Sequence, residues 1–537
     1  TPVPAPDRTP EIARGVVYED RDADGRRDAG EPGLPGVLVS NGREIAQTDA
    51  DGAYELPAAD DTILFVIKPR GFRTALDERN LPRFFYVHKP DGSPDEGFRY
   101  PGSEPTGPLP ESVDFGLIPQ EEPESFTVLV FGDTQPYTLE EVDYVARDVL
   151  VPLKEQGAHG AAFVISLGDL VGDDLSLFEP LNEAQALLGL PFYNVIGNHD
   201  MNFMAGHSDA TASDPDRYSD ETYEATYGPA TYAFAYGGAH FIVLDDVVWH
   251  GYKGLRKNGR PVNSNYTGGL REDQLAFVAA YLEHVPEDEL VVLSMHIPFA
   301  HGEQAIARQG ELLGLLSGRP HTLSLSGHTH IQEHLFFGSA DGYVSAGGGQ
   351  NGAEHHHLNS VTVSGSWWRG VKDEQGIPVA TMACGAPNGY TLLHVEGNRY
   401  RSEFRAARAP AEHQMTIWLP EGMDTSGAGG EDLVVNVFNG SERSRTRFRV
   451  LPFGEVAGAT EWRTLARSER EDPYYLDQKS REEANPGYRP LPKPRKSGHV
   501  FAGRMPEGLP AGVHVLEVES TDLYGQTVRG QRHVRVR

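Results

Sequence analysis

The pattern of apolar and polar positions changes twice along the chain. Before Ser125 and after about Met415, short runs alternate apolar and polar residues, with Gly, Pro and Asp between them, as in antiparallel strands. Between these two points, apolar strands alternate with amphipathic helical stretches, which is typical of an α/β sheet covered by helices. The sequence therefore predicts an α/β domain over residues 125–405, flanked by two β-sandwich domains over residues 11–120 and 411–537.

The same pattern predicts individual elements. In the central domain the predicted strands are Phe126–Phe131, Phe163–Leu167, Phe192–Ile196, Phe241–Leu244, Val291–Met295 and Leu323–Ser326, and the predicted helices are about Leu139–Gln156, Phe178–Leu188 and Arg271–His284. The flanking strands are Gly15–Tyr18, Gly36–Val39, Gly52–Leu56 and Thr62–Ile67, and near the end Gly512–Glu519 and Thr527–Val536. A long Pro- and Gly-rich loop over 82–110 and a polar linker over 121–124 separate the first two domains.

Composition excludes several classes of protein. The 537 residues include 78 acidic and 47 basic side chains, a formal charge of −31, which argues against nucleic acid or an anionic membrane as the main partner. No apolar run approaches the roughly 18 residues of a membrane span. The single cysteine, Cys384, excludes a disulfide scaffold and a cysteine-based zinc site. The first residue, Thr1, predicts a processed end, so we expect an exported protein, periplasmic or extracellular, whose oligomeric state composition does not determine.

Potential metal ligands follow one predicted strand after another in the central domain. They are Asp133 and Gln135, then Asp169, then Asn198, His199 and Asp200, then His296, and finally His328 and His330. The carboxyl ends of strands border the ligand crevice of an open α/β sheet, so these side chains can converge. Carboxylate, imidazole and amide donors suit divalent Zn, Mn, Fe or Ni, which the sequence does not distinguish. Two such ions about 3.5–4 Å apart can clamp a phosphoryl oxygen and activate a water.

These residues lie in five short motifs. The motifs are Gly132-Asp133-Thr134-Gln135, Gly168-Asp169, Gly197-Asn198-His199-Asp200, the lone His296, and Gly327-His328-Thr329-His330. Each is common alone, as an ordinary polar loop, but five in order after apolar strands are specific. With them, residues 125–405 resemble the calcineurin-like metallophosphoesterase superfamily, and the flanking β domains resemble its three-domain bacterial type. The resemblance implies a four-layer α/β core (a βαβ sandwich) and hydrolysis of phosphomonoesters, phosphodiesters or both.

The resemblance also implies a role for each residue. The first metal would take Asp133, Gln135, Asp169 and His330, and the second Asp169, Asn198, His296 and His328, with a metal-bridging hydroxide attacking phosphorus. His199 would protonate the leaving group or stabilise charge, and Asp200 would orient its ring. Two positions depart from the pattern. Gln135 replaces a common histidine, which predicts a weaker first site, and Gly172 replaces the tyrosine of purple acid phosphatases, which argues against a tyrosinate-bound ferric ion.

A second motif lies in the N-terminal domain. Its potential ligands are Asp20, Asp22, Asp24, the Arg26 carbonyl, Asp28 and Glu31. They fit a twelve-residue calcium loop, although no helix follows it. The segment resembles the calcium loops of bacterial surface B-type repeats, which are β domains. The alternative is a solvated acidic turn. If Ca²⁺ binds there, we expect it to support folding, with little coupling to a catalytic domain that begins about a hundred residues later.

A third region of interest spans residues 347–390. It contains His355–His357, Trp367, Trp368, Arg369 and Asn388. It can line the crevice, with Arg369 and Asn388 binding substrate phosphate. It can equally be a structural loop that packs against the C-terminal domain. The whole chain likewise has an alternative to an enzyme, namely a cell-surface binding or structural protein whose phosphoesterase-like domain holds metals without turnover.

Overall fold

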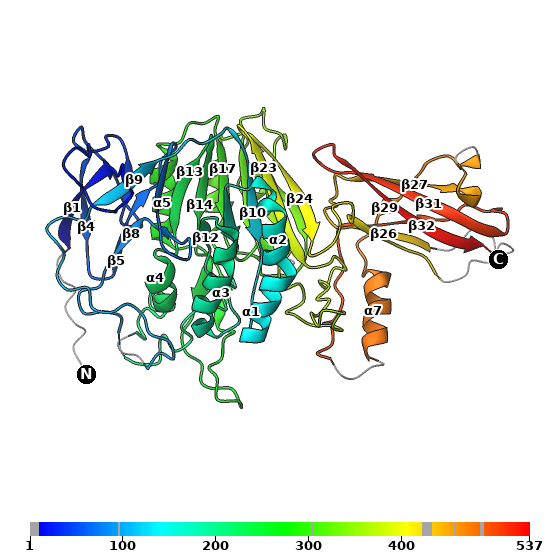
Figure 1. Cartoon of the computed structure of the whole chain (residues 1–537), viewed down its shortest axis with the longest axis horizontal. Helices are drawn as coiled ribbons and strands as arrows, with labels where there is room; N and C mark the ends of the chain where they lie inside the picture. The colour runs from blue at the N-terminus through cyan, green and yellow to red at the C-terminus, as the bar shows by residue number, and fades with distance from the viewer. Residues whose placement is uncertain are drawn as a thin grey trace.

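The computed structural model describes residues 10–94, 97–209, 211–301, 304–420, 432–455, 458–483 and 488–536. It has three parts, with the α/β core between an N-terminal and a C-terminal β domain (Figure 1). Within these residues, no helix is long and apolar enough to cross a membrane. The predicted class, an α/β core flanked by two β domains, is confirmed.

The core contains two mixed sheets, in which parallel and antiparallel strand pairs both occur. The strand order of the first sheet is β12 (Phe192–Asn194), β11 (Phe163–Ser166), β10 (Ser125–Phe131), β23 (Gly389–Glu396), β24 (Arg399–Ala406). The strand order of the second sheet is β13 (Tyr232–Tyr236), β14 (Ala239–Val243), β17 (Leu290–Ser294), β20 (Thr322–Ser326), β22 (His355–Asn359), β21 (Glu333–Phe337). Their inner faces pack through aromatic rings, with Phe163 and Phe241 edge to face at 5.2 Å. Within each sheet the ligand-bearing strands are parallel, so their carboxyl ends meet at one edge.

Helices border these sheets. They are α1 (Leu139–Val145), α2 (Val151–Glu155), α3 (Phe178–Gln185), α4 (Glu221–Tyr227), α5 (Glu272–Leu282) and α6 (Gln309–Leu316). The predicted helix over 139–156 is divided, because a π-helical turn, Ala146–Leu150, separates α1 from α2. Pro152 explains the irregularity, since it has no N–H for a regular helical bond. Short hairpins, β15 (Val247–Trp249) with β16 (Tyr266–Gly268) and β18 (Ala300–His301) with β19 (Gln304–Ala305), extend from the core.

The N-terminal domain packs two sheets of its own. They are β4 (Ala53–Ala58), β1 (Glu11–Glu19), β9 (Phe115–Pro119), β6 (Phe72–Leu76), β7 (Pro82–Arg83), and β3 (Ile45–Gln47), β2 (Leu38–Ser40), β5 (Thr62–Ile67), β8 (Phe85–His88). One continuous apolar core joins this domain to the catalytic one, for example through Phe65 and Phe277. Of the segment expected as a polar linker, only the Glu122 side chain is buried, in an ion pair with Lys68 at 2.6 Å, whereas Glu121, Pro123 and Glu124 are exposed. The two domains are therefore not separated by a free linker, and weak coupling between calcium binding and catalysis stays a prediction.

The C-terminal domain has a separate core. Its sheets are β25 (Met415–Trp418), β26 (Asp432–Val437), β30 (Val500–Arg504), β29 (Ala466–Arg467), and β28 (Arg463–Thr464), β27 (Arg445–Leu451), β31 (Gly512–Thr521), β32 (Thr527–Val536). The sequence analysis missed α7 (Pro473–Glu483), which lies beside the core in Figure 1. Asp472 directly precedes Pro473, the first residue of α7, and its carboxylate accepts the Tyr474 N–H. This Asp-Pro pair was the available sequence signal for a helix start.

The histidines of β22 form a ladder against the serines of β20. His355 bonds Thr322 and Ser324, and His357 bonds Ser324 and Ser326, at 2.6–2.8 Å. Both rings are fully buried. Burial lowers the pKa of His355 to about 3 and that of His357 well below its ordinary value, so both imidazoles are neutral. These histidines are structural and do not line a crevice.

The ladder has a fixed direction and ends at the metal-ligand loop. The Asn359 amide donates to the Ile331 carbonyl, so its oxygen must accept from the Ser326 hydroxyl. Ser326 then accepts from Nε2–H of His357, and the same reasoning runs back along the ladder. The Asn359 amide also donates to Thr329, the residue between His328 and His330. The ladder therefore holds the loop that carries two expected ligands.

The neutral ladder makes a testable contribution to acid stability. Unfolded His355 takes up a proton below about pH 6.5, whereas the folded ring does not. The free energy of unfolding therefore decreases as pH falls below 6.5. In urea unfolding at pH 5–6, His355→Gln should reduce the pH slope of the unfolding free energy by about 1.4 kcal/mol per pH unit. Ser324→Ala breaks the same ladder but keeps both imidazoles, so it should lower stability at an unchanged slope. A slope that His355→Gln leaves intact would contradict the neutral ring.

Candidate metal centre

The loops that carry the expected ligands have strained backbones. Positive φ values occur at five of them: Asp133 (+24°), Gln135 (+39°), Asp169 (+48°), His328 (+70°) and His330 (+54°). Non-glycine residues rarely adopt such values, and they concentrate at functional sites. The neighbouring glycines are required by close packing, since a Cβ on Gly197 would lie 2.0 Å from the Asp169 nitrogen. A Cβ on Gly327 would lie 2.3 Å from Asp133 Oδ1. The chain is thus folded tightly around these side chains.

Asp133, Gln135 and His330 form the first half of the cluster. All three are at most 1% exposed. His330 Nε2 lies 3.1 Å from Asp133 Oδ2, and the Gln135 amide nitrogen lies 3.2 Å from Asp169 Oδ2. Asp133 Oδ2 and Gln135 Oε1 are buried without a hydrogen-bond partner among the described residues. These two oxygens are the ones that a metal ion would use.

Asp169, Asn198, His296 and His328 form the second half. His296 Nε2 lies 3.3 Å from Asp169 Oδ1, 3.0 Å from Asn198 Oδ1 and 3.2 Å from His328 Nδ1. Ligand atoms of Asp169, His296 and His328 all lie within 4.8 Å of one another. Asp169 contacts residues of both halves, so the structure brings the seven expected ligands together, and Asp169 lies where a bridging ligand would.

The hydrogen bonds of the histidines favour a cation in this cluster. His296 Nδ1 bonds the Leu167 carbonyl at 2.8 Å, and His330 Nδ1 bonds the Gly365 carbonyl. A carbonyl only accepts, so each Nδ1 carries the proton, and each Nε2 faces a carboxylate. Two electron-rich atoms at 3.1–3.3 Å need a positive charge between them, either a proton or a metal ion. Burial opposes a charge on His296, but Asp169 outweighs it and raises the His296 pKa to about 10. The donor set therefore fits divalent metal ions.

His199 lies at the edge of the cluster. Its backbone N–H donates to Asp169 Oδ1 at 2.8 Å, and its Nε2 lies 3.9 Å from Asp169 Oδ2. Its Nδ1 donates to Asp173 Oδ1 at 2.6 Å. Burial opposes charge on the ring, but Asp169 and Asp173 outweigh it and raise the His199 pKa to about 9. Nε2 is thus the protonated atom that faces the cluster.

The orienting role expected of Asp200 belongs to Asp173. Both Asp200 carboxylate oxygens accept backbone N–H groups, from Gly197, Leu170 and Val171 at 2.9–3.0 Å, so Asp200 fixes the loop instead of the ring. The Asn263 amide also donates to both oxygens of Asp173, at 2.8 and 2.9 Å. The available signal for Asp173 was a second Gly-Asp pair, four residues after the first.

Another residue that the sequence analysis missed is Asp246. It is fully buried and accepts the backbone N–H groups of His296 and Ile297 at 3.0–3.1 Å, which fixes the lone histidine. Burial raises the pKa of Asp246 to about 7. No motif surrounds this aspartate in the sequence, so only the fold identifies its role.

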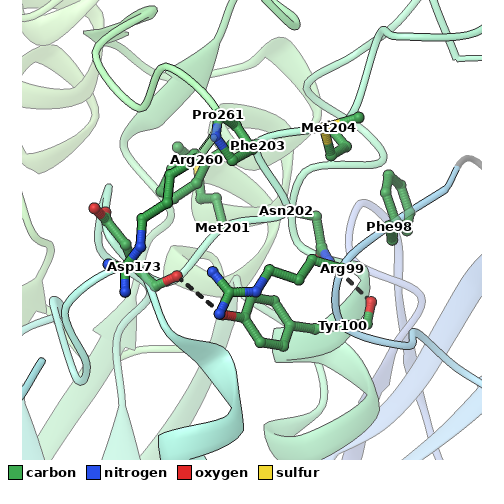
Figure 2. A pocket seen from close by; sticks show the side chains of 10 residues that line it. All are labelled: Phe98, Arg99, Tyr100, Asp173, Met201, Asn202, Phe203, Met204, Arg260 and Pro261. Carbon is green, nitrogen blue, oxygen red and sulfur yellow. Dashed lines mark hydrogen bonds between the residues drawn. The ribbon is translucent and has the colours of Figure 1, made fainter. Parts of the chain in front are cut away.

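The N-terminal domain reaches the acid side of the site. Tyr100 donates to the Asp174 carboxylate at 2.8 Å and bonds the Asp173 carbonyl at 3.4 Å. Figure 2 shows Tyr100 and Asp173 in the wall of a small pocket. The other lining residues are Phe98, Arg99, Met201, Asn202, Phe203, Met204, Arg260 and Pro261. The loop that follows β8 therefore supports the residue that orients His199. The long loop expected over 82–110 begins only after β7 and β8, which occupy its first residues.

Tyr137 fills the space beside Gly172. A Cβ on Gly172 would lie 2.6 Å from the Tyr137 ring, so a larger residue at position 172 is incompatible with this ring position. The Tyr137 hydroxyl accepts from the Gln135 amide at 3.3 Å, and its ring meets His199 edge to face. Tyr137, from another loop, thus occupies the space that a tyrosine side chain at position 172 would need.

The two expected substrate residues have different positions. Arg369 lies 5.4 Å from the ring of Trp367, which in turn lies 4.1 Å from the His330 ring. Asn388 is buried, and its amide donates to the Asp148 carboxylate and the Val363 carbonyl at 2.6 and 2.9 Å. These bonds give Asn388 a structural role, which corrects the expectation that it binds phosphate.

The acidic loop of the N-terminal domain forms a separate cluster. Oxygens of Asp20, Asp22 and Asp24 lie within 4.8 Å of one another. Glu31 closes the loop by accepting the backbone N–H groups of Arg21 and Asp28, at 2.8 and 3.0 Å. Asp20 is only 1% exposed, and its Oδ1 has no hydrogen-bond partner among the described residues. A buried carboxylate oxygen without a donor is costly, which favours a cation here over a solvated turn.

Comparisons with known proteins show similarity at low sequence identity. No curated protein matches it. Solved structures similar to it include a dimetal phosphatase from Danio rerio, 14% identical with a TM-score of 0.33, a match covering 52% of this chain and 99% of that one. Another is the purple acid phosphatase PPD1 from yellow lupin (Lupinus luteus) seeds, 11% identical with a TM-score of 0.34, covering 74% of this chain and 67% of that one.

Family models match most of the chain in three successive pieces. Residues 21–101 match the N terminal of Calcineurin-like phosphoesterase, residues 126–332 match Calcineurin-like phosphoesterase itself, and residues 356–528 match the C terminal of Calcineurin-like phosphoesterase. The central match contains every expected metal ligand and His199. The chain therefore belongs to the calcineurin-like phosphoesterase family, in the form whose core is flanked by an N-terminal and a C-terminal domain.

Proposed function

We propose that this protein hydrolyses phosphomonoesters, phosphodiesters or both, with two divalent transition-metal ions. The ions would be held by Asp133, Gln135, Asp169, Asn198, His296, His328 and His330. The observation that carries the proposal is the geometry of His296 and His330, whose Nδ1 atoms bond carbonyls while their Nε2 atoms face carboxylates. When bound, such a pair of ions neutralises charge on the phosphoryl oxygens and lowers the pKa of a shared water.

The protein's own residues supply the proton for the leaving group. Asp173 holds His199 through Nδ1, which leaves Nε2–H directed at the cluster. Two cations would lower the His199 pKa by cancelling the Asp169 charge, so the bond to Asp173 is what keeps the ring protonated. His199 can then donate to the departing alkoxide.

The first test compares metal content with turnover. We expect about two divalent transition-metal ions per chain by elemental analysis, and hydrolysis of p-nitrophenyl phosphate, bis-p-nitrophenyl phosphate or both. Asp169→Asn should lose two-metal occupancy, because it removes the carboxylate that contacts both halves of the cluster. A metal-loaded protein that hydrolyses neither ester would support the binding or structural alternative. Two tightly held metals in the variant would contradict the bridging role.

The second test separates the acid from metal binding. His199→Ala should retain both metals and lose rate by about 10²–10⁴-fold, more for alkyl than for p-nitrophenyl esters, because poor leaving groups need protonation. Asp173→Asn should show the same dependence on the leaving group with a smaller loss, since the ring keeps its position but loses a stabilising charge. The matched control is Asp174→Asn, whose carboxylate bonds Tyr100 instead of His199. Equal losses for both ester classes in His199→Ala would remove the acid role.

We also propose that Asp20, Asp22, Asp24, the Arg26 carbonyl, Asp28 and Glu31 bind Ca²⁺. An ion that binds only the folded loop stabilises it by mass action, so Ca²⁺ should raise the melting temperature. Because this domain shares a core with the catalytic domain, the shift should appear in their common transition. Asp24→Ala should abolish the shift in a calorimetric scan and leave the phosphoesterase rate near the parent's at moderate temperature. A parent protein whose melting temperature ignores Ca²⁺ would return the loop to a solvated turn.

A further inference from the structure

Two arginines from different parts of the chain lie near each other beside the aromatic rings that border the cluster. Arg369 follows Trp367 and Trp368, and Arg489 lies just after α7. The two segments are joined directly, because the Gly370 N–H donates to the Arg489 carbonyl at 2.9 Å. Burial and the charge of Arg489 lower the Arg369 pKa, as expected of adjacent cations. Both arginines lie in the segment that matches the family's C-terminal model.

Neither arginine is fully neutralised by the protein. Arg369 is half-buried, its Nε has no hydrogen-bond partner, and no carboxylate forms an ion pair with it in the described part of the chain. The Arg489 guanidinium lies 3.8 Å from the Glu141 carboxylate, a long ion pair, and the Arg489 side chain is 48% exposed. Glu141 in turn accepts the Tyr137 N–H at 2.6 Å, so its charge is shared. Two guanidiniums thus face a single carboxylate, an arrangement that leaves room for an anion.

Each arginine is separated from the metal ligands by one aromatic ring. Arg369 lies 5.4 Å from the Trp367 ring, which contacts His330. Arg489 lies 5.7 Å from the Tyr137 ring, whose hydroxyl bonds Gln135. A phosphoryl group bound at the cluster would contact the metal site directly, whereas each arginine is farther from that site by the width of one aromatic side chain. They are therefore placed for a second charged group of the substrate, with two aromatic rings beside the intervening part.

We propose that Arg369 and Arg489 form a subsite for a second anionic group, a phosphate or carboxylate a few bonds from the phosphorus that reacts. The subsite deepens the proposed function and rests on it. It assigns the C-terminal domain a direct part in substrate choice, since Arg489 comes from that domain. The substrate class is then a phosphate ester with at least two anionic groups.

The test uses two matched substrates, 4-carboxyphenyl phosphate and its methyl ester, which differ by one negative charge. Arg489→Gln should lower kcat/KM for the carboxylate by about ten- to a hundredfold, the effect of a charge-assisted hydrogen bond, and change it little for the methyl ester. Arg369→Gln should act in the same direction. The control is Arg481→Gln, an exposed arginine on α7, which should change neither.

Binding of non-hydrolysable analogues separates this inference from the proposed function. By calorimetry, 4-carboxybenzylphosphonate should bind the parent more tightly than benzylphosphonate, and Arg489→Gln should remove the difference. If that difference appears without any ester hydrolysis, the subsite stands and the proposed function fails. If both esters are hydrolysed but neither arginine variant discriminates between them, the subsite fails alone. Equal loss on both substrates would make Arg489 a structural residue and would also overturn the proposal.

Discussion

One buried carboxylate, that of Asp169, connects ligand-bearing residues from both sheets of the core. It is 2% exposed and lies at the end of β11, yet it contacts Gln135 from the β10 loop and His296 from β17 in the other sheet. A carboxylate removed from water must be matched by positive charge or hydrogen bonds. The surrounding loops supply both, and they adopt positive φ values that cost roughly 1–3 kcal/mol each. Such strain persists only where the surrounding structure holds it in place.

Both flanking domains contribute residues near this carboxylate. On the acid side, Tyr100 of the N-terminal domain contacts Asp173, which holds His199. Arg489 of the C-terminal domain lies over Tyr137, which contacts Gln135 and meets the His199 ring edge to face. The core alone therefore presents the metal ligands, whereas the environment of the proton donor and of the substrate depends on its neighbours. This arrangement gives a physical reason for three domains in one chain.

Much of this could be predicted from the sequence because the relevant patterns are local. An apolar strand followed by glycine and a polar residue places a ligand at a strand end, which is why all seven expected ligands converge. Asp200 was assigned wrongly because adjacency in sequence suggested contact, whereas the turn directs its carboxylate to backbone N–H groups. The role of Arg489 depends on contacts between distant segments, which no local pattern encodes, whereas for Asp173 the sequence offered only a second Gly-Asp pair. The shared core of the first two domains was missed because a charged residue, Glu122, is buried with its own counter-ion.

The histidines of the core show how partners, and not residue type, decide chemistry. His296 and His330 each bond a backbone carbonyl, which can only accept, so the proton is fixed on Nδ1 and Nε2 is left facing a carboxylate. His355 and His357 bond hydroxyls, which can both donate and accept, so these rings are satisfied while neutral. The first pair is complete only with a cation, and the second needs none. The neutral ladder ends at Asn359, whose amide donates to Thr329 between His328 and His330. The uncharged histidines thus help to fix the loop whose histidines face the cluster.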